Sequence, residues 1–107
     1  MAPSQLEIKV RSLQRLLKEE KYYQQELSEQ QALVYKLKTD ETVDPYDLKK
    51  QVEVLEDTER LLPALYAKIT QFRDDLAQFT RSYNGAEDLE PATITLKDAE
   101  NLLRSKS

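Results

Sequence analysis

The side chains that most often carry enzyme chemistry are missing from this sequence. It has no cysteine, which excludes thiolate nucleophiles, disulfides and zinc sites built on thiolates. It has no histidine either, and histidine is the commonest general base and metal ligand. Neighbouring carboxylates such as Glu19 with Glu20, or Asp74 with Asp75, diverge on a helix and do not form an acid–base pair. We therefore predict that the protein is not an enzyme and binds no cofactor.

Four acidic residues between positions 40 and 47 could present oxygen ligands to a cation. They lack the spacing of an EF-hand and the glycine that its loop requires. The single glycine of the chain, Gly85, also excludes a glycine-rich phosphate loop. We predict no metal site at this cluster, which consists of Asp40, Glu41, Asp44 and Asp47.

Surface recognition is the chemistry that the remaining residues support. Three cations and one tyrosine follow the spacing i, i+4, i+7 and i+11 from Arg11, which places them on one stripe of a helix. Arginine and tyrosine are typical anchors of protein interfaces, although a charge run is more often a solvated face. A second group begins at Tyr46, outside the apolar stripe of another helix. The predicted partner-binding set is Arg11, Arg15, Lys18, Tyr22, Tyr46, Lys49 and Lys50.

An apolar stripe runs from Leu48 to Tyr83 and predicts a long helix over residues 45–83. Its eleven positions alternate spacings of three and four, and nine are apolar or aromatic. Asp44 is a suitable N-cap for Pro45 at the first helical position, and Gly85 is expected to end the helix in the left-handed conformation. The stripe consists of Leu48, Gln51, Leu55, Thr58, Leu62, Leu65, Ile69, Phe72, Leu76, Phe79 and Tyr83.

Pro63 lies in the middle of this helix. An interior proline costs about 3 kcal/mol, because it removes a hydrogen bond and clashes with the preceding turn. Pro63 falls at heptad position b on the outer face, and burial of Leu62 and Leu65 beside it returns roughly 1.5–3 kcal/mol each. We therefore predict a continuous helix that is kinked at Pro63.

Two further helices are predicted, over residues 4–38 and 91–104. Ser4 and Glu7 form a capping box for the first, whose register slips near Glu20. Glu20 is expected near the interior or, in the favoured interpretation, as a carboxylate that reaches outward or pairs with a lysine. Pro91 begins the third helix, although the β-branched residues that follow leave Thr95 as an alternative start. The predicted apolar positions are Leu6, Val10, Leu13, Leu17, Tyr23, Leu27, Val34 and Leu37, and then Leu89, Ala92, Leu96, Ala99 and Leu103.

Together these helices predict an all-α fold, an elongated antiparallel three-helix bundle with coiled-coil-like heptad packing in a single domain, residues 1–107. The short polar connection over residues 39–43 favours an antiparallel return. Val54, Leu61 and Tyr66 flank the stripe, and we expect a third helix to bury Val54 and Leu61 in the core. Tyrosines 22, 35 and 46 are harder to explain as core and predict an exposed partner surface.

The composition favours a soluble, intracellular, helical protein. Charged residues make up 34% of the chain, the net charge is −4 and glycine occurs once. A negative net charge disfavours nucleic acid, and no apolar run has the length of a membrane span or a signal peptide. We predict a protein that binds neither nucleic acid nor membranes.

Several strings resemble the tubulin-binding cofactor A family, in the manner of its fungal members. They are VDPYDLKKQ at 43–51, VLEDT at 54–58, RLLP at 60–63, LEIKV at 6–10 and LKEEKYY at 17–23. The resemblance implies a three-helix tubulin chaperone that binds β-tubulin released from the cytosolic chaperonin and passes it toward α/β-heterodimer assembly, without using nucleotide. It also implies a cytoplasmic, cytoskeleton-associated protein that contacts tubulin through helical faces. Monomer and homodimer both remain open.

A structural coiled-coil protein is the alternative. Such a protein would self-assemble, or join a larger complex, through the stripe from Leu48 to Tyr83. A self-sufficient bundle unfolds independently of its concentration, whereas an obligate coiled coil melts at a higher temperature as its concentration rises.

Overall fold

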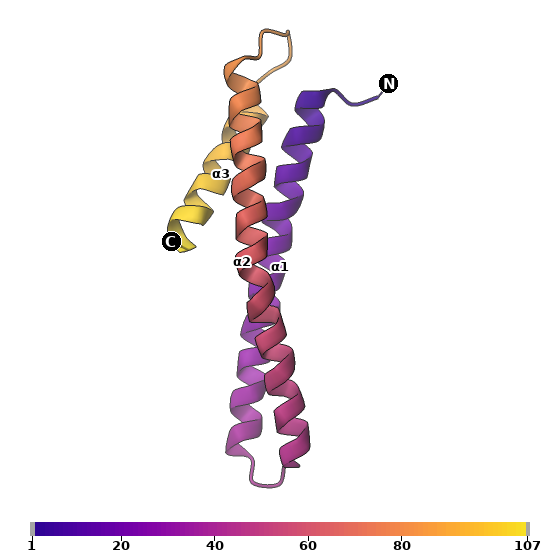
Figure 1. Cartoon of the computed structure of the whole chain (residues 1–107), viewed down its shortest axis with the longest axis vertical. Helices are drawn as coiled ribbons and strands as arrows, with labels where there is room; N and C mark the ends of the chain where they lie inside the picture. Colours follow the sequence, from indigo (N-terminus) through magenta and orange to yellow (C-terminus); the bar gives the residue numbers. More distant parts are fainter. Residues whose placement is uncertain (1, 107) are drawn as a thin grey trace. The chain divides into compact units, whose positions relative to one another are not determined.

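The computed structural model describes residues 2–106 and contains three α-helices joined by two connections (Figure 1). Helix α1 spans Gln5–Thr39, α2 spans Pro45–Arg81 and α3 spans Glu90–Lys106. No strand occurs among these 105 described positions, which confirms the all-α three-helix prediction. The alternative start of the third helix at Thr95 is wrong, because the Asp88 carboxylate accepts a hydrogen bond from the Glu90 backbone N–H (2.9 Å) and caps the helix five residues earlier.

The contacts of the chain gather into two compact units, which are described separately. The three-helix unit comprises residues 2–18 and 65–106, so it contains the start of α1, the end of α2 and all of α3. The hairpin unit comprises residues 19–64, with the end of α1, the first connection and the start of α2. The organisation as a single domain stays a prediction.

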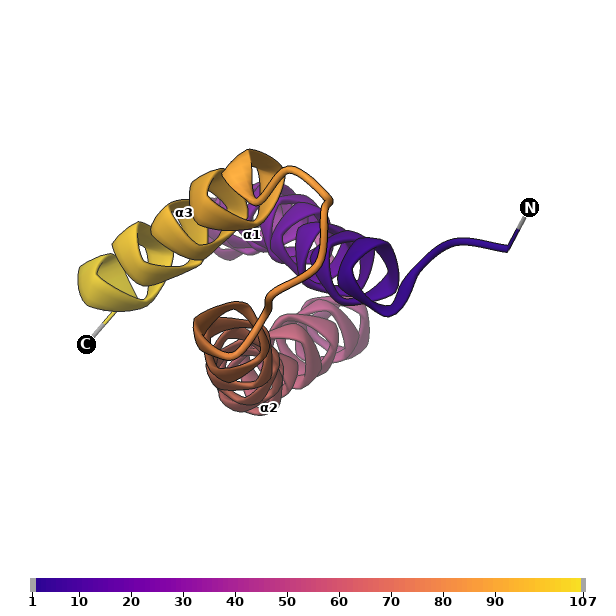
Figure 2. The same ribbon diagram turned by 90° about the horizontal axis from the view of Figure 1, so that it is seen from above.

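Three helices surround one apolar interior in the three-helix unit (Figure 2). Leu13, Ile69 and Leu76 are completely buried there. The small side chains of Ala92 and Ala99 are also buried, and they allow α3 to approach its neighbours closely. This core contains side chains from all three helices.

Thr95 is buried beside these alanines, although the predicted stripe of the third helix omitted it. Its hydroxyl donates to the Pro91 carbonyl (2.8 Å) and accepts from the Gln14 side-chain amide on α1 (3.2 Å). A buried hydroxyl with both partners supplied carries little desolvation cost. Thr95 therefore joins α3 to α1.

The register of α1 slips two turns earlier than predicted. Leu16 is buried, whereas Leu17 is only half-buried, so the step of three residues follows Leu13. Glu20 then occupies a regular seam position and is 5% exposed. Its placement near the interior is confirmed, and the expectation that its carboxylate reaches outward is wrong, while its pairing with a lysine stays a prediction.

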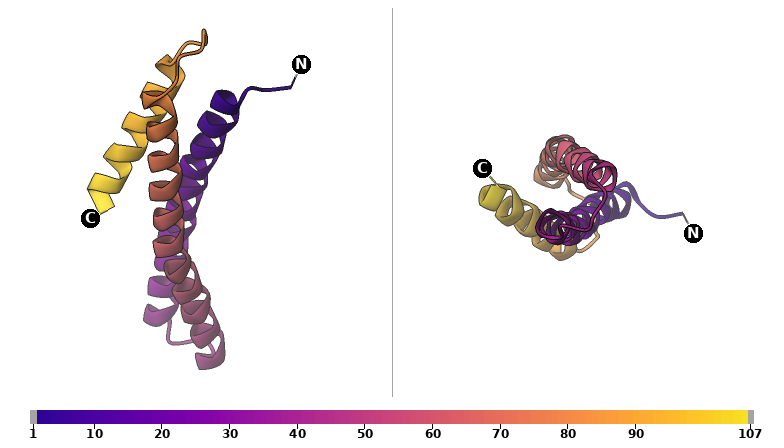
Figure 3. Two further views of the ribbon diagram at one scale, coloured as in Figure 1. Left: turned by 45° about the horizontal axis from the view of Figure 1, so that its top comes forward. Right: turned by 90° about the horizontal axis from the view of Figure 1, so that it is seen from below.

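The hairpin unit is a pair of helices joined by residues 40–44 (Figure 3). The Asp40 carboxylate accepts hydrogen bonds from the Thr42 backbone N–H (2.9 Å) and hydroxyl (2.6 Å), which fixes the turn. The Asp44 carboxylate accepts from the Tyr46 N–H (2.9 Å), as predicted for an N-cap. This short connection makes the two helices antiparallel neighbours.

Helix α2 is continuous through Pro63, as predicted. All eleven positions of its apolar stripe are buried or half-buried, and Pro63 is exposed. The outward position of the proline leaves the packed face of the helix intact. The kink itself stays a prediction.

The expected left-handed cap at Gly85 is wrong. Helix α2 ends at Arg81, and Gly85 has no positive φ. The Tyr83 ring lies against Gly85, where a β-carbon would stand only 2.6 Å from Tyr83 Cζ. The Tyr83 hydroxyl accepts from the Glu87 N–H (3.2 Å) and donates to the Glu87 carboxylate (3.1 Å). Glycine is therefore required here for close approach of an aromatic ring.

Candidate partner-binding surface

The three predicted cations of α1 are exposed on the three-helix unit. Arg11 lies 3.6 Å from the Glu7 carboxylate, an exposed i, i+4 pair. Arg15 and Lys18 follow on the same helix and are also exposed. Exposed ion pairs are worth about 0–1 kcal/mol, so such a pair gives way to a partner at little cost.

The other four residues of the predicted set lie in the hairpin unit. Tyr22 on α1 is 60% exposed and Tyr46 on α2 is 62% exposed. The Lys50 ammonium stands 5.3 Å from the centre of the Tyr46 ring, a cation–π arrangement, and Lys49 is exposed. The structure thus brings Tyr46 and Lys50 together at the start of α2.

The acidic cluster of the first connection already has local hydrogen-bond partners. Asp40 and Asp44 accept the turn and cap hydrogen bonds described above. The hydrogen bond from the Thr42 hydroxyl, then that from its N–H, and then the charge of Lys36 hold the pKa of Asp40 below its usual value. Within residues 2–106 no group of three or more acidic, histidine or cysteine side chains could hold a metal ion.

Large apolar side chains are exposed mainly on the hairpin unit. Val54 and Leu61 are 44% and 51% exposed, so the expectation that they belong to the core is wrong. The reason is that α3 lies in the three-helix unit, and the described part of the hairpin unit has only two helices. The tyrosines expected outside the core are exposed. The hairpin side chains concerned are Tyr22, Leu33, Tyr35, Tyr46, Val54 and Leu61, and those of the three-helix unit are Ile8 and Ile94.

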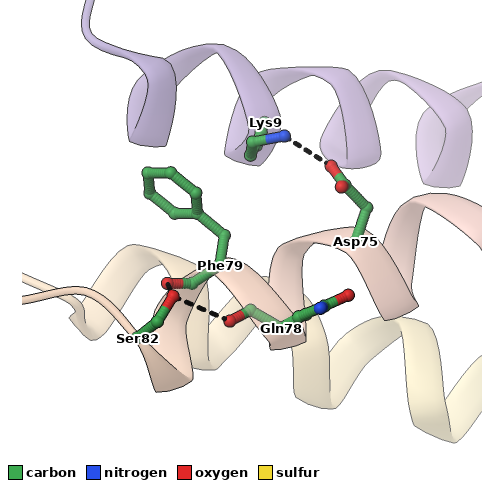
Figure 4. A network of polar contacts seen from close by, with 5 residues as sticks. All are labelled: Lys9, Asp75, Gln78, Phe79 and Ser82. Atoms are coloured by element: carbon green, nitrogen blue, oxygen red, sulfur yellow. Dashed lines mark hydrogen bonds and ion pairs between the residues drawn. The ribbon is translucent and has the colours of Figure 1, made fainter.

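A polar contact between α1 and α2 was missed at the sequence level (Figure 4). The Lys9 ammonium lies 2.6 Å from the Asp75 carboxylate and 5.4 Å from the centre of the Phe79 ring. Lys9 precedes the seam residue Val10, and Asp75 precedes the seam residue Leu76, so both occupy heptad position g. Their opposite charges at equivalent positions were the available signal.

A shallow groove of about 440 Å³ lies between the starts of α1 and α3. Leu6, Val10, Pro91 and Ala92 supply its apolar lining, and Arg11 lies on its border. The groove is open to solvent and has no nucleophile with a general base beside it, so it offers binding rather than catalysis.

A model of one protein family, described as tubulin binding cofactor A, matches residues 1–103. The chain belongs to the tubulin binding cofactor A family. This confirms the resemblance of its strings to that family. Tubulin-specific chaperone A of Saccharomyces cerevisiae is 60% identical over 106 residues, covering 99% of this chain and 100% of the yeast protein. The human tubulin-specific chaperone A is 27% identical over 86 residues, covering 80% and 79% of the two chains.

Solved structures of cofactor A proteins share the fold. Rbl2p, a β-tubulin binding post-chaperonin cofactor, superposes with a TM-score of 0.89 at 58% identity, covering 94% of this chain and 99% of Rbl2p. Tubulin folding cofactor A from Arabidopsis thaliana superposes with a TM-score of 0.76 at 29% identity, covering 90% and 92%. None of the helices described between residues 2 and 106 has the length and apolarity needed to cross a membrane.

Proposed function

We propose that this chain is a tubulin-folding cofactor that captures β-tubulin monomers released from the cytosolic chaperonin and passes them toward α/β-heterodimer assembly. The observation that carries the proposal is the likeness to Rbl2p, a β-tubulin binding cofactor with 58% identity and a TM-score of 0.89. That likeness covers 99% of Rbl2p, so nearly the whole length of the relative has a counterpart in this chain.

Capture works by mass action and requires no reaction on the cofactor. A protein that binds one folding intermediate lowers the free concentration of that intermediate, and with it the self-association of exposed client surface. Binding alone performs the role, without nucleotide, metal or catalysis by this chain. This function places the protein in the cytoplasm, in association with the cytoskeleton that its client forms.

The proposed contact set consists of exposed cations and tyrosines. On α1 the side chains are exposed along a regular spacing, and on α2 the cation–π pair of Lys50 and Tyr46 presents charge and aromatic surface together. An acidic client surface attracts such residues. This attraction raises the rate of association and fixes the register of the complex. The set is Arg11, Arg15, Lys18, Tyr22, Tyr46, Lys49 and Lys50.

Charge reversal tests this set. The double variant Arg15→Glu with Lys18→Glu should weaken binding to purified β-tubulin at least tenfold, or about 1.4 kcal/mol, without changing helical circular dichroism. The matched control, Lys68→Glu with Lys97→Glu, makes the same charge change at exposed positions of the three-helix unit. Equal binding by both double variants would remove the α1 stripe from the contact. Failure of the wild type to bind β-tubulin, or equal binding of α-tubulin, would contradict the function.

Self-assembly through the α2 stripe is the less favoured function. Every position of that stripe is buried or half-buried within the single chain, which leaves little of it for a second copy. Thermal unfolding at several protein concentrations tests this alternative, since a midpoint that does not rise with concentration contradicts self-assembly through the stripe.

A further inference from the structure

One edge of the hairpin unit combines apolar side chains with heptad positions that usually hold charges. With Leu62 at position a of α2, Val54 and Leu61 fall at g. With Val34 at position a of α1, Leu33 also falls at g. These three side chains are 44%, 51% and 41% exposed. The edge is therefore apolar and uncovered.

Residues at position g lie beside one another in this antiparallel pair of helices. The ion pair of Lys9 and Asp75 in the three-helix unit shows this directly, since both residues occupy g and their charged atoms are 2.6 Å apart. Charged pairs are the usual occupants of such positions. Leucine and valine there bury only about half of their surface within the hairpin.

The remaining g positions of the hairpin unit are acidic. They are occupied by Glu19, Glu26 and Asp47. The whole unit carries twelve acidic and six basic residues, a net charge of −6. A partner that covers the apolar edge must therefore also neutralise negative charge around it.

A third helix is the element that completes such a pair. In the three-helix unit α3 packs on α1 and α2, and that unit contains the completely buried side chains Leu13, Ile69 and Leu76. In the hairpin unit the most buried side chains retain 5–8% exposure. Val54 and Leu61 are seven residues apart, about 10 Å along α2, which matches apolar residues spaced i, i+7 on a partner helix.

We propose that the g edge of the hairpin unit, defined as Leu33, Val54 and Leu61 with Glu19, Glu26 and Asp47, binds an amphipathic helix of the client whose apolar stripe is bordered by lysine or arginine. The inference rests on the proposed function, because it takes β-tubulin as the client. It adds an apolar contact to the cationic and aromatic set and specifies the chemistry of the client segment.

The test compares two pairs of half-exposed residues. The edge variant is Leu33→Ser with Leu61→Ser, and the matched control is Ile8→Ser with Ile94→Ser, whose side chains are 50% and 54% exposed on the three-helix unit. Binding of each full-length protein to purified β-tubulin is measured by fluorescence anisotropy. We expect the dissociation constant of the edge variant to rise about tenfold or more, and that of the control to stay within about twofold. Glu26→Lys should weaken binding in the same direction, because it repels a basic border.

Each other outcome overturns the inference in a distinguishable way. If the wild type binds and the edge variant binds equally well, the edge is not a contact, while the proposed function stands. If the edge variant and the control lose affinity equally, the effect is not specific to this edge. If sedimentation equilibrium shows that the wild type is a dimer and the edge variant is a monomer, the g edge binds a second copy of the chain instead of the client. If the wild type does not bind β-tubulin, the proposed function and the inference fail together.

Discussion

Leu61 and Leu62 form a matched pair for testing the register of α2. They are adjacent in sequence, yet Leu61 is 51% exposed at position g and Leu62 is 8% exposed at position a. Replacing either by alanine removes the same three carbon atoms from the same helix. Any difference in the free energy of unfolding therefore reports the difference in burial.

The expected magnitudes follow from that burial. A buried leucine replaced by alanine costs about 2–5 kcal/mol, because lost apolar transfer adds to the cavity left behind. We expect about 3 kcal/mol for Leu62→Ala. Leu61 realises only about half of the 1.5–3 kcal/mol available to a fully buried side chain, and water fills the space that its removal leaves. Since alanine is also the better helix former, we expect about 0.5–1 kcal/mol for Leu61→Ala.

Urea unfolding followed by helical circular dichroism measures both variants. With an m-value of about 1.5 kcal/mol per molar urea, the midpoint should fall by about 2 M for Leu62→Ala and by about 0.5 M for Leu61→Ala. Amide hydrogen exchange in residues 45–64 gives a second readout confined to the hairpin unit. Equal losses for the two variants would refute the register, because they would require another element to cover Leu61.

Three further perturbations have outcomes set by local structure. Pro63→Ala should raise the free energy of unfolding by about 1–2 kcal/mol in urea denaturation, because it restores a helical N–H at an exposed position. Gly85→Ala should lower it by about 1 kcal/mol and shift the NMR signals of the Tyr83 ring, since the new methyl group collides with that ring. The Asp40 carboxyl should titrate below pH 3.8 in NMR, and Thr42→Val should raise its pKa. Because the folded pKa is lowered, Asp40 stabilises the fold above about pH 4, and this contribution declines as the pH falls through the folded pKa.

Each of these outcomes can fail in a recognisable way. A loss of stability in Pro63→Ala would show that packing depends on the bend which proline imposes. A stability gain in Gly85→Ala would show that reduced freedom of the unfolded chain outweighs the contact with Tyr83. An Asp40 midpoint at or above the usual range for aspartate would contradict the hydrogen bonds from Thr42.

The helices and their seam could be predicted because periodicity is a local property. The stripe from Leu48 to Tyr83 and the caps at Asp44 and Pro45 depend on residues within a few turns of one another. The coverage of Leu61 depends instead on which helices share a unit, and a repeat of seven residues carries no information about that. The same limit hid the burial of Thr95, whose partner Gln14 lies 81 positions away.

The residue types of the candidate contact surface could be predicted from the sequence, but the location of that surface only in part. Exposed arginine, lysine and tyrosine are recognisable because the seam does not need them, and the structure leaves all of the predicted set exposed. Val54 and Leu61 of the g edge were assigned to the core instead, because apolar residues beside a seam can be covered either by a third helix of the same chain or by a helix of a partner. Only the placement of α3 separates these two origins.

The side chain of Glu87 links two segments that are distant in sequence. Its carboxylate accepts hydrogen bonds from the Ser4 hydroxyl (2.8 Å) and from the Tyr83 hydroxyl. The Ser4 hydroxyl also caps α1, because it accepts a hydrogen bond from the Glu7 N–H (3.1 Å). A helix start and an interhelical connection are ordinarily the first places to fray. Here the start of α1 and the connection after α2 share hydrogen bonds through Glu87. Opening of one segment therefore breaks hydrogen bonds of the other, so their opening is coupled. A purification tag attached ahead of Ser4 would consequently disturb residues 83–87, and a tag after α3 is the better choice for binding measurements.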